Sequence, residues 1–166
     1  MQRSGLATKS RCCRRSPAVE FMPYLTSQPI ELATLASSVG APDRGAQVTF
    51  AGVVRDHHAG RQVVSLGYTA YGPMAEQVCA ELVSEVKRRW RVQVALSHRL
   101  GELNVGDVAV AIVVSSQHRG VAFAACRWLI DELKTRVPIW KRERYADGAA
   151  AWVDPTAPGG AIASAT

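Results

Sequence analysis

The segment KTRVPIWKRERY, residues 134–145, gathers basic side chains around a single proline. Lys134 and Lys141 stand on either side of Pro138, which disfavours helical backbone in the residue before it and so turns the chain. Such a corner can direct both side chains to the same side. Two ammonium groups held close together lower each other's pKa and can provide a neutral amine for nucleophilic or base chemistry, whereas separate, hydrated ones stay cationic. The segment therefore predicts an anion site and leaves its chemistry open.

A second polar cluster, SSQHRG, lies at residues 115–120, where a predicted strand passes into a predicted helix. His118 and Arg119 fall at the helix N-terminus, where free backbone N–H groups and the helix dipole favour an anion. Ser115 or Ser116 can cap the helix. The alternative is a capped helix with two exposed polar residues, and the junction alone favours that alternative.

A third candidate group ends the strand-like stretch GVVRDHH, residues 52–58. The planar donors of Arg55 suit a phosphate or carboxylate, although a solvated surface arginine is the alternative. His57 and His58 follow, but neighbouring side chains of an extended chain point in opposite directions and no third ligand is evident. We therefore expect no metal site here.

The elements that position these groups follow from hydrophobic periodicity. We expect two helices, over 72–90 and 119–136, and strands over 47–54, 62–71, 92–101, 108–116, 139–146 and 149–153. The first two strands are expected to form a hairpin. The first helix is expected to bury Met74, Val78, Leu82, Val86 and Trp90, and the second Ala122, Ala125, Cys126, Leu129, Ile130 and Leu133. The order predicts an α+β domain with both helices on one side of a mainly antiparallel sheet.

Composition limits the classes of function. The 166 residues, 48% hydrophobic and 20% charged, suit one soluble domain, and no apolar run is long enough to span a membrane. The net charge of +6 suggests nucleic acid, but five basic residues lie in 1–21, which hold one acidic residue, Glu20. We expect 1–21 to be a basic extension: an organelle transit peptide, a disordered arm or the product of an upstream start codon. We expect residues 22–153 to form the domain and 154–166 to be a flexible tail.

The four cysteines show no spacing typical of a zinc site. Cys79 and Cys126 fall within the helical patterns and are expected to be buried apolar residues. A reducing cytoplasm is the simplest compartment for such a chain.

Four segments, in this order and spacing, closely resemble the molybdopterin synthase catalytic (large) subunit family: GAQVTFAGVVRDH, LSHRLGELNVGD, SSQHRGVAFAACRWLIDELKTRVPIWKRE and WV. The resemblance runs from about Ile30 to Val153. It implies an α/β hammerhead-like fold, and a homodimer that binds small ubiquitin-like sulfur-carrier subunits to form a heterotetramer. The implied enzyme is a sulfurtransferase that moves sulfur from the carrier's C-terminal Gly-Gly thiocarboxylate to cyclic pyranopterin monophosphate. The product is the molybdopterin dithiolene, and neither a metal nor another cofactor is implied.

The resemblance also implies roles for individual residues. Lys134 matches the principal catalytic lysine and Lys141 the second active-site lysine. The implied substrate-binding set is Val53, Val54, Arg55, His118, Arg119, Lys134, Lys141, Arg142 and Glu143. In the family these groups meet at the dimer interface. Two alternatives stand beside this interpretation: a small basic α+β RNA-binding module, and a non-catalytic scaffold that keeps the carrier-binding surface.

Overall fold

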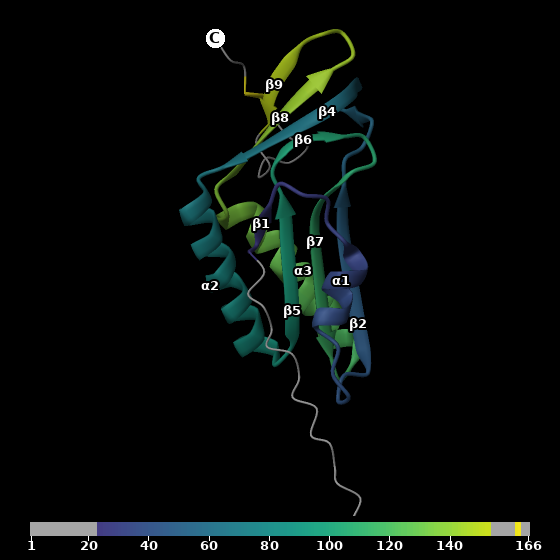
Figure 1. The fold of residues 1–166 in the computed structure, drawn as a ribbon, viewed down its shortest axis with the longest axis vertical. Coiled ribbons are helices and arrows are strands. Elements are labelled where there is room, and N and C mark those ends of the chain that lie inside the picture. Colours follow the sequence, from purple (N-terminus) through teal and green to yellow (C-terminus); the bar gives the residue numbers. More distant parts are fainter. Residues whose placement is uncertain (1–22, 154–161, 164–166) are drawn as a thin grey trace, which may run out of the picture.

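Two β-sheets follow one another along the long axis of the molecule, and helices cover only one of them (Figure 1). The computed structural model describes residues 23–153 and 162–163. The helices are α1 (Leu32–Ser38), α2 (Gly72–Trp90) and α3 (Arg119–Arg136). The strands are β1 (Leu25–Thr26), β2 (Ala46–Val53), β3 (His57–His58), β4 (Arg61–Ala70), β5 (Gln93–Arg99), β6 (Gly101–Asn104), β7 (Val108–Ser116), β8 (Ile139–Tyr145), β9 (Ala150–Val153) and β10 (Ile162–Ala163).

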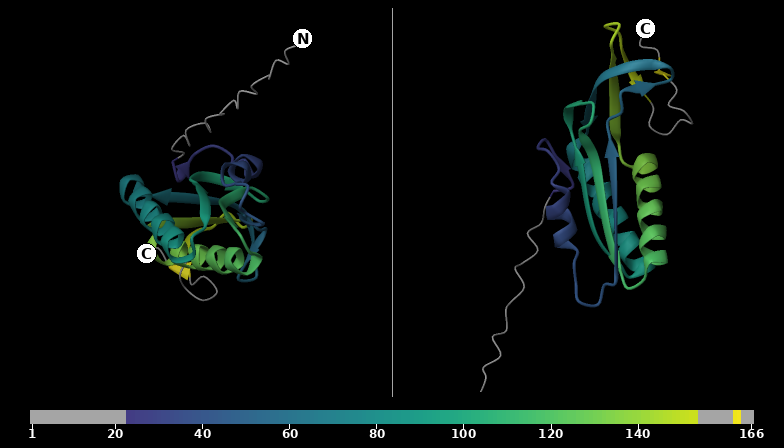
Figure 2. Two further views of the ribbon diagram at one scale, coloured as in Figure 1. Left: turned by 90° about the horizontal axis from the view of Figure 1, so that it is seen from below. Right: turned by 90° about the vertical axis from the view of Figure 1, so that its right-hand side faces the viewer.

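The four-stranded sheet has the order β1-β5-β7-β2, and β7 pairs antiparallel with both of its neighbours. β7 is buried along almost its whole length, as its nearly unbroken apolar sequence requires. Val110, Ile112 and Val114 pack towards α2 and α3, while Ala111 and Val113 pack with α1 on the opposite face. The sheet is therefore covered on both faces (Figure 2).

Both long helices begin and end where the sequence predicts. Pro73 lies in the first turn of α2, and α3 ends at Arg136 because Pro138 holds Val137 in an extended conformation. All six residues predicted for the buried face of α3 are buried. The face predicted for α2 is partly wrong: Met74 is 53% exposed, and the buried residues are Ala75, Cys79, Leu82, Val83 and Val86. α2 packs against both the sheet and α3. Its buried face is therefore wider than, and shifted from, the single row of residues at four-residue spacing that was predicted.

The second sheet has the order β10-β9-β8-β4-β3, with β6 also paired to β4. The predicted hairpin of 47–54 with 62–71 is wrong. β2 pairs with β7, while β4 pairs with β8, β6 and the short β3. Ala59 and Gly60, both with positive φ, turn the chain directly from β3 into β4, so the local hairpin forms there. β2 is left to complete the helix-covered sheet.

One predicted strand, 92–101, divides between the two sheets. β5 ends at Arg99 in the four-stranded sheet, and β6 starts at Gly101, whose φ of 96° favours glycine and redirects the chain to β4. The elements α1 and β1 have no counterpart in the prediction. β10 lies within the predicted tail, while the rest of 154–166 and residues 1–21 fall outside the described residues. None of the described helices is long and apolar enough to cross a bilayer.

Candidate active site

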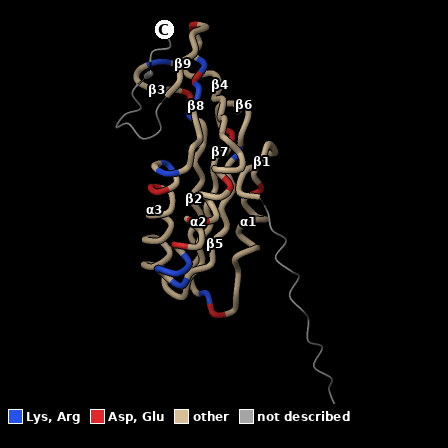
Figure 3. Tube along the Cα trace, turned by 90° about the vertical axis from the view of Figure 1, so that its left-hand side faces the viewer, with Lys and Arg blue, Asp and Glu red and all other residues tan. Residues whose placement is uncertain are grey.

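A pocket of about 340 Å³ opens where the two sheets meet the C-terminal end of α3. Its apolar walls come from β2, β4, β7, α3 and β8. Its polar and charged lining side chains are Arg55, His57, Tyr68, His98, Lys134, Lys141 and Glu143. Lys and Arg positions lie in β8 and at the end of α3 that approaches it (Figure 3). The pocket therefore combines an apolar interior with several positive groups.

The corner at Pro138 brings the two lysines to this one pocket. Lys134 extends from the last turn of α3 and Lys141 from the early part of β8, and both line the cavity. Between them Val137 adopts φ −81° and ψ 124°, which ends the helix and starts the strand. A short local feature of the sequence thus decides where both amines lie.

Arg55 reaches the pocket because β2 ends irregularly. The register between β2 and β7 shifts between Gly52 and Val53, and a Cβ on Gly52 would lie 2.6 Å from a methyl group of Val110. Beyond this point Val53 and Arg55 line the pocket, whereas Val54 is buried in the smaller core between the sheets. Val54 can therefore support the wall but does not line it.

Two of the pocket's cations are available for a ligand. Across residues 23–153, neither the Arg55 side chain nor the Lys134 side chain has a hydrogen-bond or ion-pair partner. Both side chains are exposed at the pocket. An anion that entered would meet a planar guanidinium and an ammonium group without displacing another partner.

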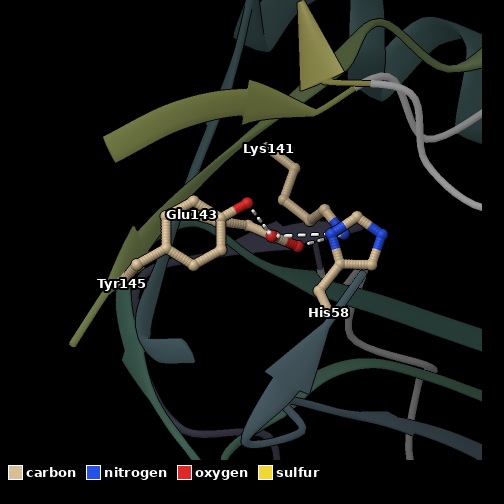
Figure 4. Close-up of polar contacts among 4 residues, drawn as sticks. All are labelled: His58, Lys141, Glu143 and Tyr145. Atoms are coloured by element: carbon tan, nitrogen blue, oxygen red, sulfur yellow. Dashed lines mark hydrogen bonds and ion pairs between the residues drawn. The ribbon is translucent and has the colours of Figure 1, made fainter. Parts of the chain in front are cut away.

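Lys141 is held differently, because its ammonium group pairs with a buried carboxylate. Glu143 is only 2% exposed, and its Oε1 lies 3.0 Å from Lys141 Nζ. Its Oε2 accepts a hydrogen bond of 2.8 Å from Tyr145 Oη and another of 2.8 Å from His58 Nδ1 (Figure 4). A carboxylate can only accept, so the proton of this His58 contact lies on Nδ1.

The surroundings of Glu143 keep it ionised. Burial on its own would raise the pKa of the carboxyl group. The hydrogen bonds from Lys141 and Tyr145, the positive charge of Lys141 and the hydrogen bond from His58 outweigh burial, so that the pKa lies below its ordinary value. A negative charge is thus built into the base of a basic pocket.

Two further pocket residues are neutral at neutral pH. Burial, with a smaller contribution from the charge of Glu143, raises the pKa of Tyr68 to about 12. Burial lowers the pKa of His98 to about 4, although a hydrogen bond of 3.0 Å from its Nδ1 to the Arg99 carbonyl oxygen acts in the opposite direction. The rings of Tyr68 and His98 pack edge to face, with centroids 5.1 Å apart. The wall therefore offers a phenol and an uncharged imidazole.

His118 and Arg119 lie elsewhere. Both are exposed and line a separate, shallow depression at the N-terminus of α3. Arg119 and Lys134 belong to the same helix, and their fifteen-residue separation corresponds to about 22 Å along its axis. The predicted serine cap is wrong: Ser115 donates to the Val39 carbonyl oxygen and Ser116 to that of His118. A single chain does not bring these groups to the lysine pocket.

Some predicted site residues point away from the pocket, and others were missed. Arg142 is exposed, because it alternates along β8 with the inward-facing Lys141 and Glu143. Three side chains at the site were not among the predicted site residues: Tyr68, His98 and Tyr145. The spacing of Lys141, Glu143 and Tyr145 in one strand was a usable signal for a shared face, whereas no local signal marked Tyr68.

Known proteins that are similar to this chain share one family. Residues 25–136 match the family model described as MoaE protein. A Nostoc sp. protein named molybdopterin synthase catalytic subunit is 38% identical over 139 residues, which cover 82% of this chain and 84% of that protein. Molybdopterin synthase catalytic subunit 1 of Mycobacterium tuberculosis is 43% identical over 134 residues, 79% of this chain and 90% of that protein. The X-ray crystal structure of molybdopterin synthase from Staphylococcus aureus aligns with a TM-score of 0.74 and 35% identity, and covers 78% of this chain and 94% of that one.

Proposed function

The chain belongs to the MoaE protein family, and from this premise we propose how its pocket transfers sulfur as the catalytic subunit of a molybdopterin synthase. The proposed acceptor is cyclic pyranopterin monophosphate, and the product is the dithiolene of molybdopterin. The proposed donor is the C-terminal thiocarboxylate of a small Gly-Gly carrier subunit. The proposal assigns the chain no metal or other cofactor, because the carrier supplies the sulfur. The RNA-binding alternative gains no support from the comparisons.

One observation carries the proposal: Arg55, Lys134 and Lys141 converge on one pocket with apolar walls. The phosphate of the proposed acceptor and the thiocarboxylate of the proposed donor are both anionic. Positive groups that are already in place stabilise such anions, and also the negative charge that develops during acyl and sulfur transfer. We assign Lys134 as the principal catalytic lysine and Lys141 as the second, with an amine able to move protons between donor and acceptor.

The proposed site uses two copies of the chain. His118 and Arg119 are too far from Lys134 in one chain to act on the same small substrate, yet they offer further positive charge at a helix N-terminus. We propose a homodimer in which this end of one chain completes the lysine pocket of its partner. Two related proteins are named as catalytic subunits, which supports a second, different subunit, and one carrier on each copy would give a heterotetramer.

We also propose a cytoplasmic location. Cys79 and Cys126 are buried free thiols, and a reducing compartment keeps such thiols reduced.

Reconstitution tests the proposed function directly. Purified protein is mixed with cyclic pyranopterin monophosphate and a Gly-Gly carrier in its thiocarboxylate form, and the dithiolene product is assayed. We expect product with this carrier and none with the same carrier ending in an ordinary carboxylate. An intact thiocarboxylated carrier that yields no product would overturn the proposal.

A further inference from the structure

We propose that His58 is a positioning residue that acts through Glu143 to hold the ammonium group of Lys141 in the pocket. This inference rests on the proposed function, in which Lys141 takes part in the reaction. It also changes the role expected for Glu143, from a substrate ligand to the buried link between a histidine and a lysine. Nothing in the sequence pattern assigned His58 to the site.

The contacts form a continuous path from the interior to the pocket. His58 is 5% exposed and comes from β3, whereas Glu143 and Lys141 come from β8; Glu143 is 85 residues further along the chain than His58. Both His58 and Glu143 are buried, and exposure then rises from 2% at the Glu143 side chain to 20% at that of Lys141. The ammonium group is therefore the member of the cluster best placed to meet a ligand (Figure 4).

The two carboxylate oxygens are used unequally. His58 and Tyr145 both donate to Oε2 of Glu143, at 2.8 Å each, and Oε1 is directed to Lys141 at 3.0 Å. Two donors on one oxygen fix the plane of the carboxylate and leave the other oxygen for the amine. If the buried carboxylate of Glu143 lost one of these donors, it would lack a hydrogen-bond partner and would tend to change its rotamer. Such a change would move Lys141 with it.

His58 lies three residues after Arg55, so its replacement can also disturb the pocket's guanidinium. The two effects differ in what they change. Loss of Arg55 from its place weakens anion binding and raises KM, whereas loss of Lys141 from its place lowers kcat. The state of the Lys141 ammonium group can be observed separately by NMR, because an NH3+ group held in an ion pair exchanges slowly enough with water to give a ¹H–¹⁵N signal.

The experiment compares four variants of the full chain. His58→Leu removes the donor, and His58→Asn keeps an amide donor close to the position of Nδ1. Tyr145→Phe removes the other donor to the same oxygen while keeping the ring that packs on Arg61. Tyr71→Phe is the matched control, because Tyr71 is an exposed tyrosine outside the pocket. Each variant is assayed for kcat and KM in the reconstituted synthase, for the Lys141 NH3+ signal, and for thermal unfolding.

We expect His58→Leu to lower kcat about tenfold or more with KM changed less than about twofold, because a small misplacement of a reacting group costs rate. Its Lys141 signal should be lost or broadened. His58→Asn should restore both kcat and the signal, Tyr145→Phe should show a smaller loss of both, and Tyr71→Phe should match the unchanged protein. If His58→Leu does not fold, the contrast of Tyr145→Phe with Tyr71→Phe still tests the positioning.

Three results would overturn the inference: an unchanged Lys141 signal in His58→Leu, a loss confined to KM, or a failure of His58→Asn to restore kcat and the signal. The two proposals fail in different ways. If the wild-type protein makes no dithiolene, the proposed function is overturned, while the NMR comparison still tests whether His58 holds Lys141.

Discussion

The two ends of α3 both carry basic side chains, but their surroundings within the chain differ. At the C-terminal end, Lys134 faces a pocket whose base holds a buried, ionised carboxylate, Glu143. At the N-terminal end, His118 and Arg119 are exposed in a shallow depression. The first region is organised by contacts within one chain. The second exposes its polar side chains without enclosing them.

Replacement of Lys134, at the C-terminal end of α3, should have the largest effect on activity. We expect Lys134→Ala to lower kcat by about a hundredfold to a thousandfold, because the variant removes the amine proposed to move protons. The side chain is exposed, so thermal unfolding should be nearly unchanged. Lys87→Ala, at an exposed lysine in the last turn of α2, is the control and should keep full activity. Full activity in Lys134→Ala would remove Lys134 from the reaction.

The buried character of the lysine pocket should also appear as a dependence of stability on pH. The pKa of His98 is about 4 in the folded protein, against an ordinary value of about 6.5 in the unfolded chain. Between these values the unfolded chain binds a proton that the folded chain does not. The contribution of the neutral His98 imidazole to the free energy of unfolding is therefore fully present above pH 6.5 and is lost as the pH falls towards 4. This group alone should lower the free energy of unfolding by about 2 kcal/mol between pH 7 and pH 4.5.

Urea unfolding at these two pH values measures that difference. In His98→Asn the amide can replace the donor to the Arg99 carbonyl oxygen but does not titrate, so the dependence on pH should become weaker by the same amount. If His98→Asn and the unchanged protein lose equal stability in acid, the imidazole is not kept neutral by burial.

Mixed dimers test whether the N-terminal end of α3 in one chain and the lysine pocket of its partner form one site. A dimer of one Lys134→Ala chain with one Arg119→Ala chain would contain one intact site if the site spans two chains. Random pairing makes about half of the dimers mixed, so about a quarter of the wild-type activity should return on coexpression. Each variant alone should stay near background. A site completed within one chain would always carry one substitution, so the absence of any recovery would contradict the two-chain proposal.

Replacement of Arg142 should have the smallest effect on activity, and it tests whether the site extends beyond the pocket. It lies on the opposite face of β8 from Lys141, so Arg142→Ala should change kcat/KM by less than about threefold. Lys141→Ala, in the same strand, is the comparison variant and should lose much more activity. A loss in Arg142→Ala that approached that of Lys141→Ala would place Arg142 in a site completed by another chain.

The parts of the site that were predictable are those with a local cause. The lysine corner depends on Pro138 and its neighbour Val137, and the position of Arg119 depends on where α3 begins. The predicted hairpin of β2 with β4 was wrong because an apolar alternating strand can pair with any suitable partner. The turn at Ala59 and Gly60 pairs β4 with the nearer strand β3.

Both long helices, the central strand β7, the family and the corner between the two lysines could be predicted from local sequence, because periodicity, proline and motif spacing act over a few residues. The burial of Glu143 between His58, Tyr145 and Lys141, and the separation of His118 and Arg119 from the lysine pocket, became visible in the folded chain. Burial of a charge depends on partners that arrive from distant parts of the chain, here 85 residues away, and a helix keeps its ends separated by its length.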